Sequence, residues 1–164
     1  ISCLRIDNPQ AGNSGNPSET GYGINYTGVE GLSLSYANAD EESGTAATSG
    51  DVTVYKASYA YGPVTASYSN SEMDIAAAAN AAGGESTSYA LSYTISDELS
   101  VTYGSETHSI DSTSVDMEIE GFSASYTSGG MTISAAMQSM DDGDFATGAN
   151  NDIDYWALGA SFAF

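Results

Sequence analysis

The chain has 164 residues, 41% of them hydrophobic, and its 22 Asp and Glu against 2 Lys and Arg give a formal net charge of -20. Such a negative protein repels nucleic acid and anionic membrane surfaces. No run approaches the roughly 18 apolar residues of a membrane-spanning helix. The single cysteine, Cys3, excludes an intrachain disulfide and a thiolate metal site.

Residues 1–19 read as an irregular loop segment, because Pro9, Gly12, Gly15 and Pro17 interrupt any regular pattern. The sequence starts without an initiating Met or a recognisable signal peptide. We therefore expect either a processed mature form or a fragment of a longer protein.

From residue 20 to residue 164, apolar and small polar side chains alternate in short runs, which is the period of a β-strand with two different faces. All 12 Tyr lie in these runs, as expected for aromatic girdles on a barrel exterior. Longer polar segments with acidic clusters separate pairs of runs. The pattern predicts antiparallel hairpins, about nine strands in all, joined by four short turns about 33 residues apart: residues 28–31, 62–63, 96–98 and 128–130.

Residues 115–119 alternate in the opposite phase to the run that follows them. One extra residue would restore the register, so we expect a β-bulge near Glu120 and Gly121. With this bulge, Asp116, Glu118 and Glu120 would lie on the face opposite the large apolar side chains. In a barrel with its apolar face outward, this second face lines the lumen, so the three carboxylates would project toward the lumen or its mouth. Carboxylates along a pore favour cations.

The last nine residues alternate large apolar and small side chains and end on an aromatic ring. Trp156, Leu158, Phe162 and Phe164 would share one face. This ending resembles the C-terminal assembly signal of Gram-negative outer-membrane porins. The specific motif covers residues 156–164, and the architectural resemblance covers residues 20–164.

The resemblance implies an all-β fold, an antiparallel transmembrane β-barrel of which this chain holds the C-terminal part, with sixteen strands in the whole. It implies a location in the cell outer membrane among lipid and lipopolysaccharide, insertion by the barrel-assembly machinery, and a homotrimer. The implied function is a porin channel for passive diffusion of small hydrophilic solutes and ions. The short turns would be periplasmic and the long acidic loops extracellular.

Small hydroxyl side chains occupy the second face of the runs, and they suit a wide water-filled lumen rather than a packed interior. Lys56 falls in this phase. It is either a pore-lining selectivity residue or an incidental solvated lysine. General porins carry a cluster of basic residues on the pore wall, and this sequence departs from that pattern, which argues against selectivity for anions or phosphate. Cation preference is expected from the net charge and from the carboxylates of residues 116–120.

Strict alternation is equally compatible with a soluble fold. The alternative is a secreted or surface-layer β-sandwich adhesin whose acidic loops bind calcium, although no segment matches a calcium-binding loop motif. An enzyme is not expected, because the single histidine, His108, would lie in a loop between Ser105 and Asp111. No cofactor and no metal site are predicted.

Overall fold

The computed structural model describes residues 2–8, 18–42, 50–75, 83–148 and 150–163. Within these residues the fold is all-β, with a short 3₁₀ turn, η2 (Gly143–Phe145). Its strands are β1 (Ser2–Asn8), β2 (Ser18–Tyr26), β3 (Leu32–Glu42), β4 (Gly50–Tyr61), β5 (Val64–Ile75), β6 (Gly84–Thr94), β7 (Leu99–Ile110), β8 (Met117–Ser128), β9 (Met131–Asp141) and β10 (Ile153–Phe162).

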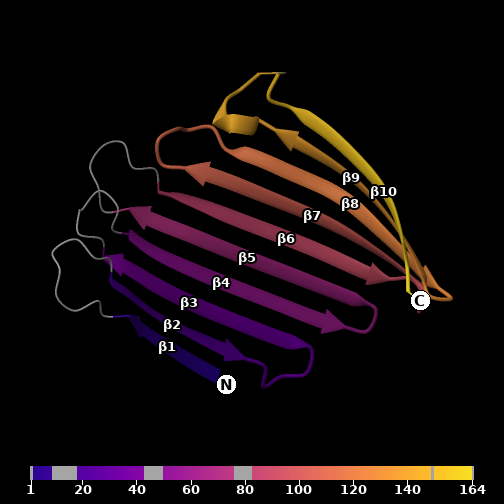
Figure 1. The fold of residues 1–164 in the computed structure, drawn as a ribbon, viewed down its shortest axis with the longest axis horizontal. Coiled ribbons are helices and arrows are strands. Elements are labelled where there is room, and N and C mark those ends of the chain that lie inside the picture. Colours follow the sequence, from indigo (N-terminus) through magenta and orange to yellow (C-terminus); the bar gives the residue numbers. More distant parts are fainter. Residues whose placement is uncertain (1, 9–17, 43–49, 76–82, 149, 164) are drawn as a thin grey trace.

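The strands form one antiparallel sheet in which each strand pairs with its neighbours in the sequence, from β1 to β10. Figure 1 shows this sheet as a curved arc with β1 and β10 at opposite edges. Among the described residues β1 and β10 are not paired, so the sheet is not closed into a barrel.

The strand count exceeds the prediction of about nine, because β1 lies within the segment predicted as loop. Residues Ser2–Asn8 pair with Asn25–Glu19 of β2. The prediction was wrong for residues 2–8, because all the Pro and Gly residues that indicate a loop follow this short strand. Residues 9–17 lie outside the described part of the chain.

Short connections join the strands at all four positions predicted for turns, after β2, β4, β6 and β8. Three of them contain glycines with positive φ: Gly31, Gly62, and the pair Gly129 and Gly130. Gly31 has φ +76, and a Cβ there would meet the Ala60 carbonyl oxygen. Gly130 has φ +82, a left-handed conformation that other residues adopt at a cost. These four connections lie at one end of the strands, which we call the turn end. The other end of the strands is the loop end.

At the loop end the strands run further than expected, and the acidic clusters predicted in loops lie partly on strands. Asp40 belongs to β3, Glu72 and Asp74 to β5, and Asp141 to β9. Backbone pairing continues where the simple apolar alternation stops, because ladder hydrogen bonds do not depend on the side chains.

The sheet is a single layer without an apolar interior. None of the described hydrophobic residues is buried. Of the described polar and charged residues, Asn70 alone is buried, with 8% of its surface exposed. A two-layer soluble domain would bury one face of its sheet against another element. No helix among the described residues has the length and apolar character needed to cross a membrane.

The pairing of β8 with both neighbours is continuous, so the predicted bulge at Glu120 and Gly121 is absent. Glu118 and Glu120 therefore share a face with Phe122 and not with the hydroxyl side chains. The phase change has another cause: apolar Met117 and Ile119 lie on the hydroxyl-bearing face, and the apolar side of the strand switches as β8 passes toward the loop end.

Candidate functional site

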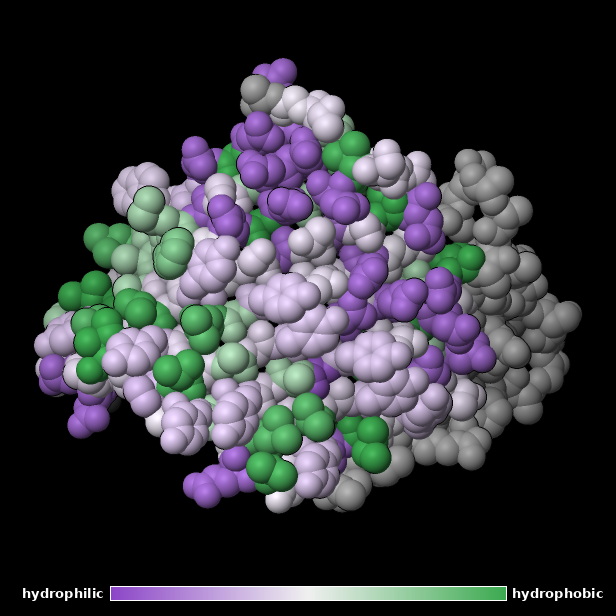
Figure 2. Space-filling model, turned by 180° about the vertical axis from the view of Figure 1, so that it is seen from behind, coloured by the Kyte–Doolittle hydropathy of each residue, from purple (hydrophilic) through white to green (hydrophobic). Residues whose placement is uncertain are grey.

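The two faces of the sheet differ in chemistry, and both are candidate functional surfaces. The face turned outward by the curvature, the convex face, exposes large apolar side chains, including Phe122 at 65%, Leu158 at 71% and Trp156 at 76%. Figure 2 shows this side, where tyrosine rings and aliphatic side chains lie side by side over most of the strands. We call this surface the apolar band.

Aromatic rings on neighbouring strands contact one another along the loop-side edge of the apolar band. The ring centroids of Tyr36 and Tyr55 are 5.1 Å apart, those of Tyr68 and Tyr89 5.1 Å, and those of Tyr103 and Phe122 4.8 Å. Tilted pairs at these distances are favourable aromatic geometry. The loop-side edge is formed by Tyr22, Tyr36, Tyr55, Tyr68, Tyr89, Tyr103, Phe122, Met137 and Trp156.

The turn-side edge of the apolar band is also aromatic on several strands, with Tyr26, Tyr61, Tyr93, Tyr126 and Phe162. Tyr155 is the exception among the twelve tyrosines predicted for the exterior. It pairs with Gln138 on the concave face, because β10, like β8, changes its apolar face near the loop end.

Both edges of the apolar band cross the strands at a slant. Following the paired residues from strand to strand, a line that starts at Tyr26 of β2 reaches β10 at Asp154. The turn-side edge of the apolar band on β10 is instead at Phe162, eight residues further along the strand. The loop-side edge shifts in the same direction between Tyr22 and Trp156. At about 3.3 Å per residue and about 4.8 Å per strand, a shift of this size is a slope of roughly 30°.

Polar groups replace the aromatic side chains directly beyond the loop-side edge. The Asn38 amide donates to the Thr53 hydroxyl at 3.0 Å. The Asn70 amide donates to the Thr87 hydroxyl at 2.9 Å and also to the Glu85 carboxylate. The convex face therefore passes within one residue pair from an apolar to a hydrogen-bonding surface.

The predicted pore-lining carboxylates lie in this polar zone. Glu118 and Glu120 are exposed on the convex face, and Glu120 accepts a hydrogen bond from the Tyr103 hydroxyl. Asp116 is exposed in the connection before β8. Glu118 and Glu120 therefore lie on the face opposite the hydroxyl side chains, because the sheet has no bulge, whereas Asp116 precedes the strand and the pairing assigns it to neither face.

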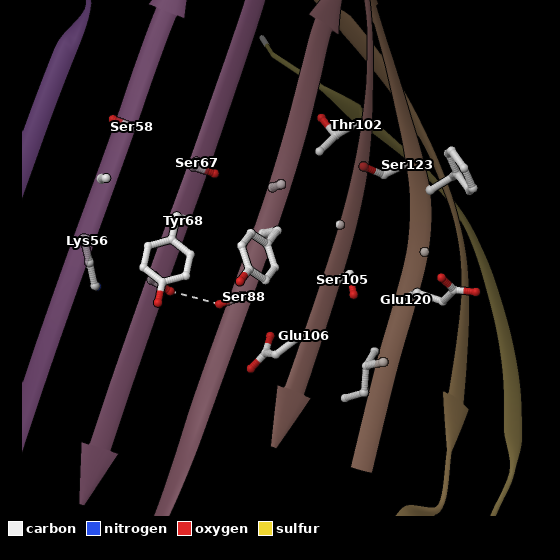
Figure 3. A pocket seen from close by; sticks show the side chains of 18 of the residues that line it. Lys56, Ser58, Ser67, Tyr68, Ser88, Thr102, Ser105, Glu106, Glu120 and Ser123 are labelled. Atoms are coloured by element: carbon white, nitrogen blue, oxygen red, sulfur yellow. Dashed lines mark hydrogen bonds between the residues drawn. The ribbon is translucent and has the colours of Figure 1, made fainter. Parts of the chain in front are cut away.

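The concave face carries rows of small hydroxyl side chains on directly opposed strand positions. Hydroxyl pairs on neighbouring strands bond to each other, at 2.9 Å for Ser69 and Ser88 and at 2.8 Å for Ser92 and Thr102. A hollow of about 560 Å³ lies over β3 to β9 on this face. Figure 3 shows Ser58, Ser67, Thr102 and Ser123 at its wall.

Lys56 lines this hollow, on the face that the sequence phase predicted (Figure 3). It pairs with Ser35 on β3 and Ser69 on β5. The other basic residue of the chain, Arg5, belongs to β1, so Lys56 is not the only cation on a strand.

Glu106 and His108 also lie on the concave face, and the sequence analysis missed them. Both belong to β7, which extends to Ile110, and so His108 is not in a loop. The His108 Nε2 and Glu106 Oε1 atoms are 2.8 Å apart, and the Ser86 hydroxyl donates to the same Oε1 at 3.3 Å. The apolar alternation stops at Tyr103, so no local sequence signal placed these two residues on a strand.

The predicted assembly-signal residues Trp156, Leu158 and Phe162 share the convex face, since they pair with Met137, Ala135 and Met131 of the apolar band. Phe164 lies outside the described residues. Within the described ranges, no group of three or more His, Cys, Asp or Glu side chains could hold a metal ion.

Neither a scan against models of known protein families nor a search of curated proteins found a match to this chain. The chemistry of the two faces is therefore the basis for assigning a function.

Proposed function

We propose that this chain forms part of a porin-like outer-membrane β-barrel that passes small hydrophilic solutes and ions by passive diffusion. The apolar band faces lipid, and the hydroxyl-bearing concave face lines water. Closure of the barrel requires either strands beyond these ten or a pairing of β1 with β10, and the sixteen-stranded barrel of the porins is the size we propose.

The slant of the apolar band carries this proposal. A band of lipid-facing side chains must lie level with the membrane, and strands of a membrane barrel are tilted by about 35–45°. The band must then cross the strands obliquely. The slope of roughly 30° found for both edges, with aromatic residues along them, fits this requirement.

Exposure of the apolar band supports the same conclusion. Monomeric soluble proteins rarely expose apolar patches larger than a few hundred Å². Here side chains such as Leu158 and Trp156 are over 70% exposed, and none of the described elements covers them. Lipid is a cover that fits a surface with aromatic rims and an aliphatic middle.

The concave face supports diffusion of hydrophilic solutes. Its small hydroxyls leave space and offer donors and acceptors in place of water. With Glu118 and Glu120 on the other face, the cation preference comes from the acidic loop end and the net charge, which attract cations to the mouth of the channel.

The partners follow from this assignment. We propose that lipopolysaccharide and outer-membrane lipid cover the apolar band, that the barrel-assembly machinery inserts the chain through its strand from Trp156 to Phe162, and that the protein assembles as a homotrimer.

A secreted adhesin with a β-sandwich fold is the second candidate. The alternation of the strands favours it equally, but a sandwich needs a second sheet over the aromatic face. Calcium at the acidic segments would be its expected ligand.

The test is a planar bilayer holding the full-length protein under a salt gradient. We expect discrete conductance steps and a reversal potential on the cation side, moved further that way by Lys56→Glu. Glu118→Gln, which changes a charge on the convex face outside the lining of the hollow, is the matched control and should shift the reversal potential less. A protein that stays in solution and never conducts would favour the adhesin.

A further inference from the structure

The concave face carries two opposite charges at one level of the sheet. Lys56 and Glu106 are the only Lys, Arg, Asp or Glu residues that the register places on this face, counted over the strand residues whose side chains the structure describes. They belong to one row: Lys56 pairs with Ser69, Ser69 with Ser88, and Ser88 with Glu106. Three strand spacings separate their backbones, about 14 Å.

The space between the two charges is lined by hydroxyl groups. Figure 3 shows Lys56 and Glu106 on either side of the Ser69 and Ser88 hydrogen bond, within the same hollow. The next row toward the turn end holds Ala90, with only a methyl group, and Gly104, with no side chain, so the hollow stays open there. A solute lying along the row would meet a cation, two hydroxyls and an anion in that order.

One oxygen of Glu106 is already engaged. Its Oε1 atom accepts a hydrogen bond from the Ser86 hydroxyl and lies beside His108 Nε2. These contacts orient the carboxylate and leave Oε2 as the atom for a solute. The Glu106 side chain is 41% exposed, so a solute in the hollow can reach it.

We propose that this row is a binding subsite for zwitterionic solutes of short-peptide length, with the solute carboxylate at Lys56 and its ammonium at Glu106. The proposal rests on the proposed function, because the concave face must be open to solutes from water.

The spacing selects the length of the solute. Side chains of a sheet stand roughly perpendicular to it, so the charged tips are separated by about the backbone distance or less on a concave face. Two hydrogen bonds of about 3 Å at the ends leave about 8 Å. An extended peptide covers about 3.3–3.6 Å per residue, so a dipeptide or tripeptide fits. Its amide groups would replace the mutual bond of Ser69 and Ser88.

The charge pattern selects the class of solute. An anion would meet Lys56 but would be repelled by the acidic protein, and a cation would use Glu106 alone. A zwitterion uses both groups and carries no net charge to be repelled. Exposed ion pairs are weak, which suits a channel because a bound solute must also leave.

The experiment measures binding of triglycine to the full-length protein folded in detergent, by saturation-transfer NMR. We expect Lys56→Gln and Glu106→Gln each to weaken binding by up to about fivefold. Glu118→Gln, the matched loss of a carboxylate from the convex face of the adjacent strand and outside the lining of the hollow, should leave binding unchanged. N-acetyl-triglycine amide, which has no charge, should bind the unaltered protein as weakly as triglycine binds the two neutral variants.

Exchanging the two charges is a stricter test, because it again places one cation and one anion in the row, in the opposite order. The double variant Lys56→Glu with Glu106→Lys should recover triglycine binding that the single changes lose. Equal binding of the uncharged analogue, or no effect of either neutral substitution, would overturn the subsite. Conductance recorded on the same samples separates the two proposals: binding without conduction removes the channel, and conduction without charge-dependent binding removes the subsite alone.

Discussion

The Tyr103 hydroxyl donates a 2.9 Å hydrogen bond to Oε2 of Glu120, and this bond joins the tyrosine ring of β7 to the first carboxylate beyond the apolar band. On the neighbouring β8 strand, Phe122 lies on one side of this boundary and Glu120 on the other. The boundary between lipid and headgroups is therefore expected at this level of the sheet.

A lysine in the middle of the apolar band should prevent stable insertion. Ala66 of β5 lies between the edge residues Val64 and Tyr68 on the convex face, so Ala66→Lys should cost about 2–4 kcal/mol of folding free energy in lipid. The neighbouring Ser67→Lys places the same charge on the concave face and should cost much less. Urea titration in lipid vesicles measures both, and equal costs would contradict the assignment of the faces.

The single tryptophan reports the depth of the band edge. Trp156 lies on the loop-side edge, so its fluorescence should be quenched most by lipids brominated near the headgroups. In the double variant Trp156→Phe with Leu158→Trp, the indole moves two residues into the band, and quenching should shift to lipids brominated deeper in the chain. An unquenched Trp156 in vesicles would argue against lipid contact.

Cysteines on adjacent residues of β7 should distinguish the two faces. In a Cys3→Ser background, Thr102→Cys places a thiol in the hollow, and a charged thiol reagent added from water should reduce conductance. Val101→Cys points the thiol into the apolar band and should not react. A conductance loss from Val101→Cys alone would reverse the orientation of the sheet.

Two turn glycines should differ in their tolerance of alanine. Both Gly31 and Gly62 have positive φ, and Gly62 has open space where a Cβ would lie. Gly62→Ala should therefore cost about 1–2 kcal/mol from the backbone alone. Gly31→Ala should cost more, because its Cβ also meets the Ala60 carbonyl, whose amide bonds to Gly31 at 2.8 Å. Denaturant titration compares the two.

The alternation of residues predicted the hairpins, the four short turns and the phase of Lys56, since side chains of period 2 and glycine turns are local signals. It did not predict the ends of the strands. Near the loop end, Val52 and Val54 of β4 and Met117 and Ile119 of β8 put apolar side chains on the concave face. In the sequence, apolar side chains that move to the other face of a strand give the same phase change as a β-bulge. The two cases are distinguished only by the pairing of the strands.

The row of Lys56 and Glu106 was beyond sequence reasoning for a related reason. The two residues are fifty positions apart, and their common level depends on three successive registers. Short turns join the strands of two of these registers, β4–β5 and β6–β7, and a longer connection joins β5 to β6. An error of one residue in any of the three registers moves the side chain to the other face.

Carboxylates face each other across strands at the loop end: Asp40 is opposite Asp51, Asp51 is opposite Asp74, and Glu72 is opposite Glu85. Like charges in such positions push the strands apart, and the repulsion reaches about 10 Å at 0.1 M salt but only about 3 Å at 1 M. This end of the sheet should therefore fray in fresh water and tighten in brine, while the turn end, with few charges, is indifferent to salinity.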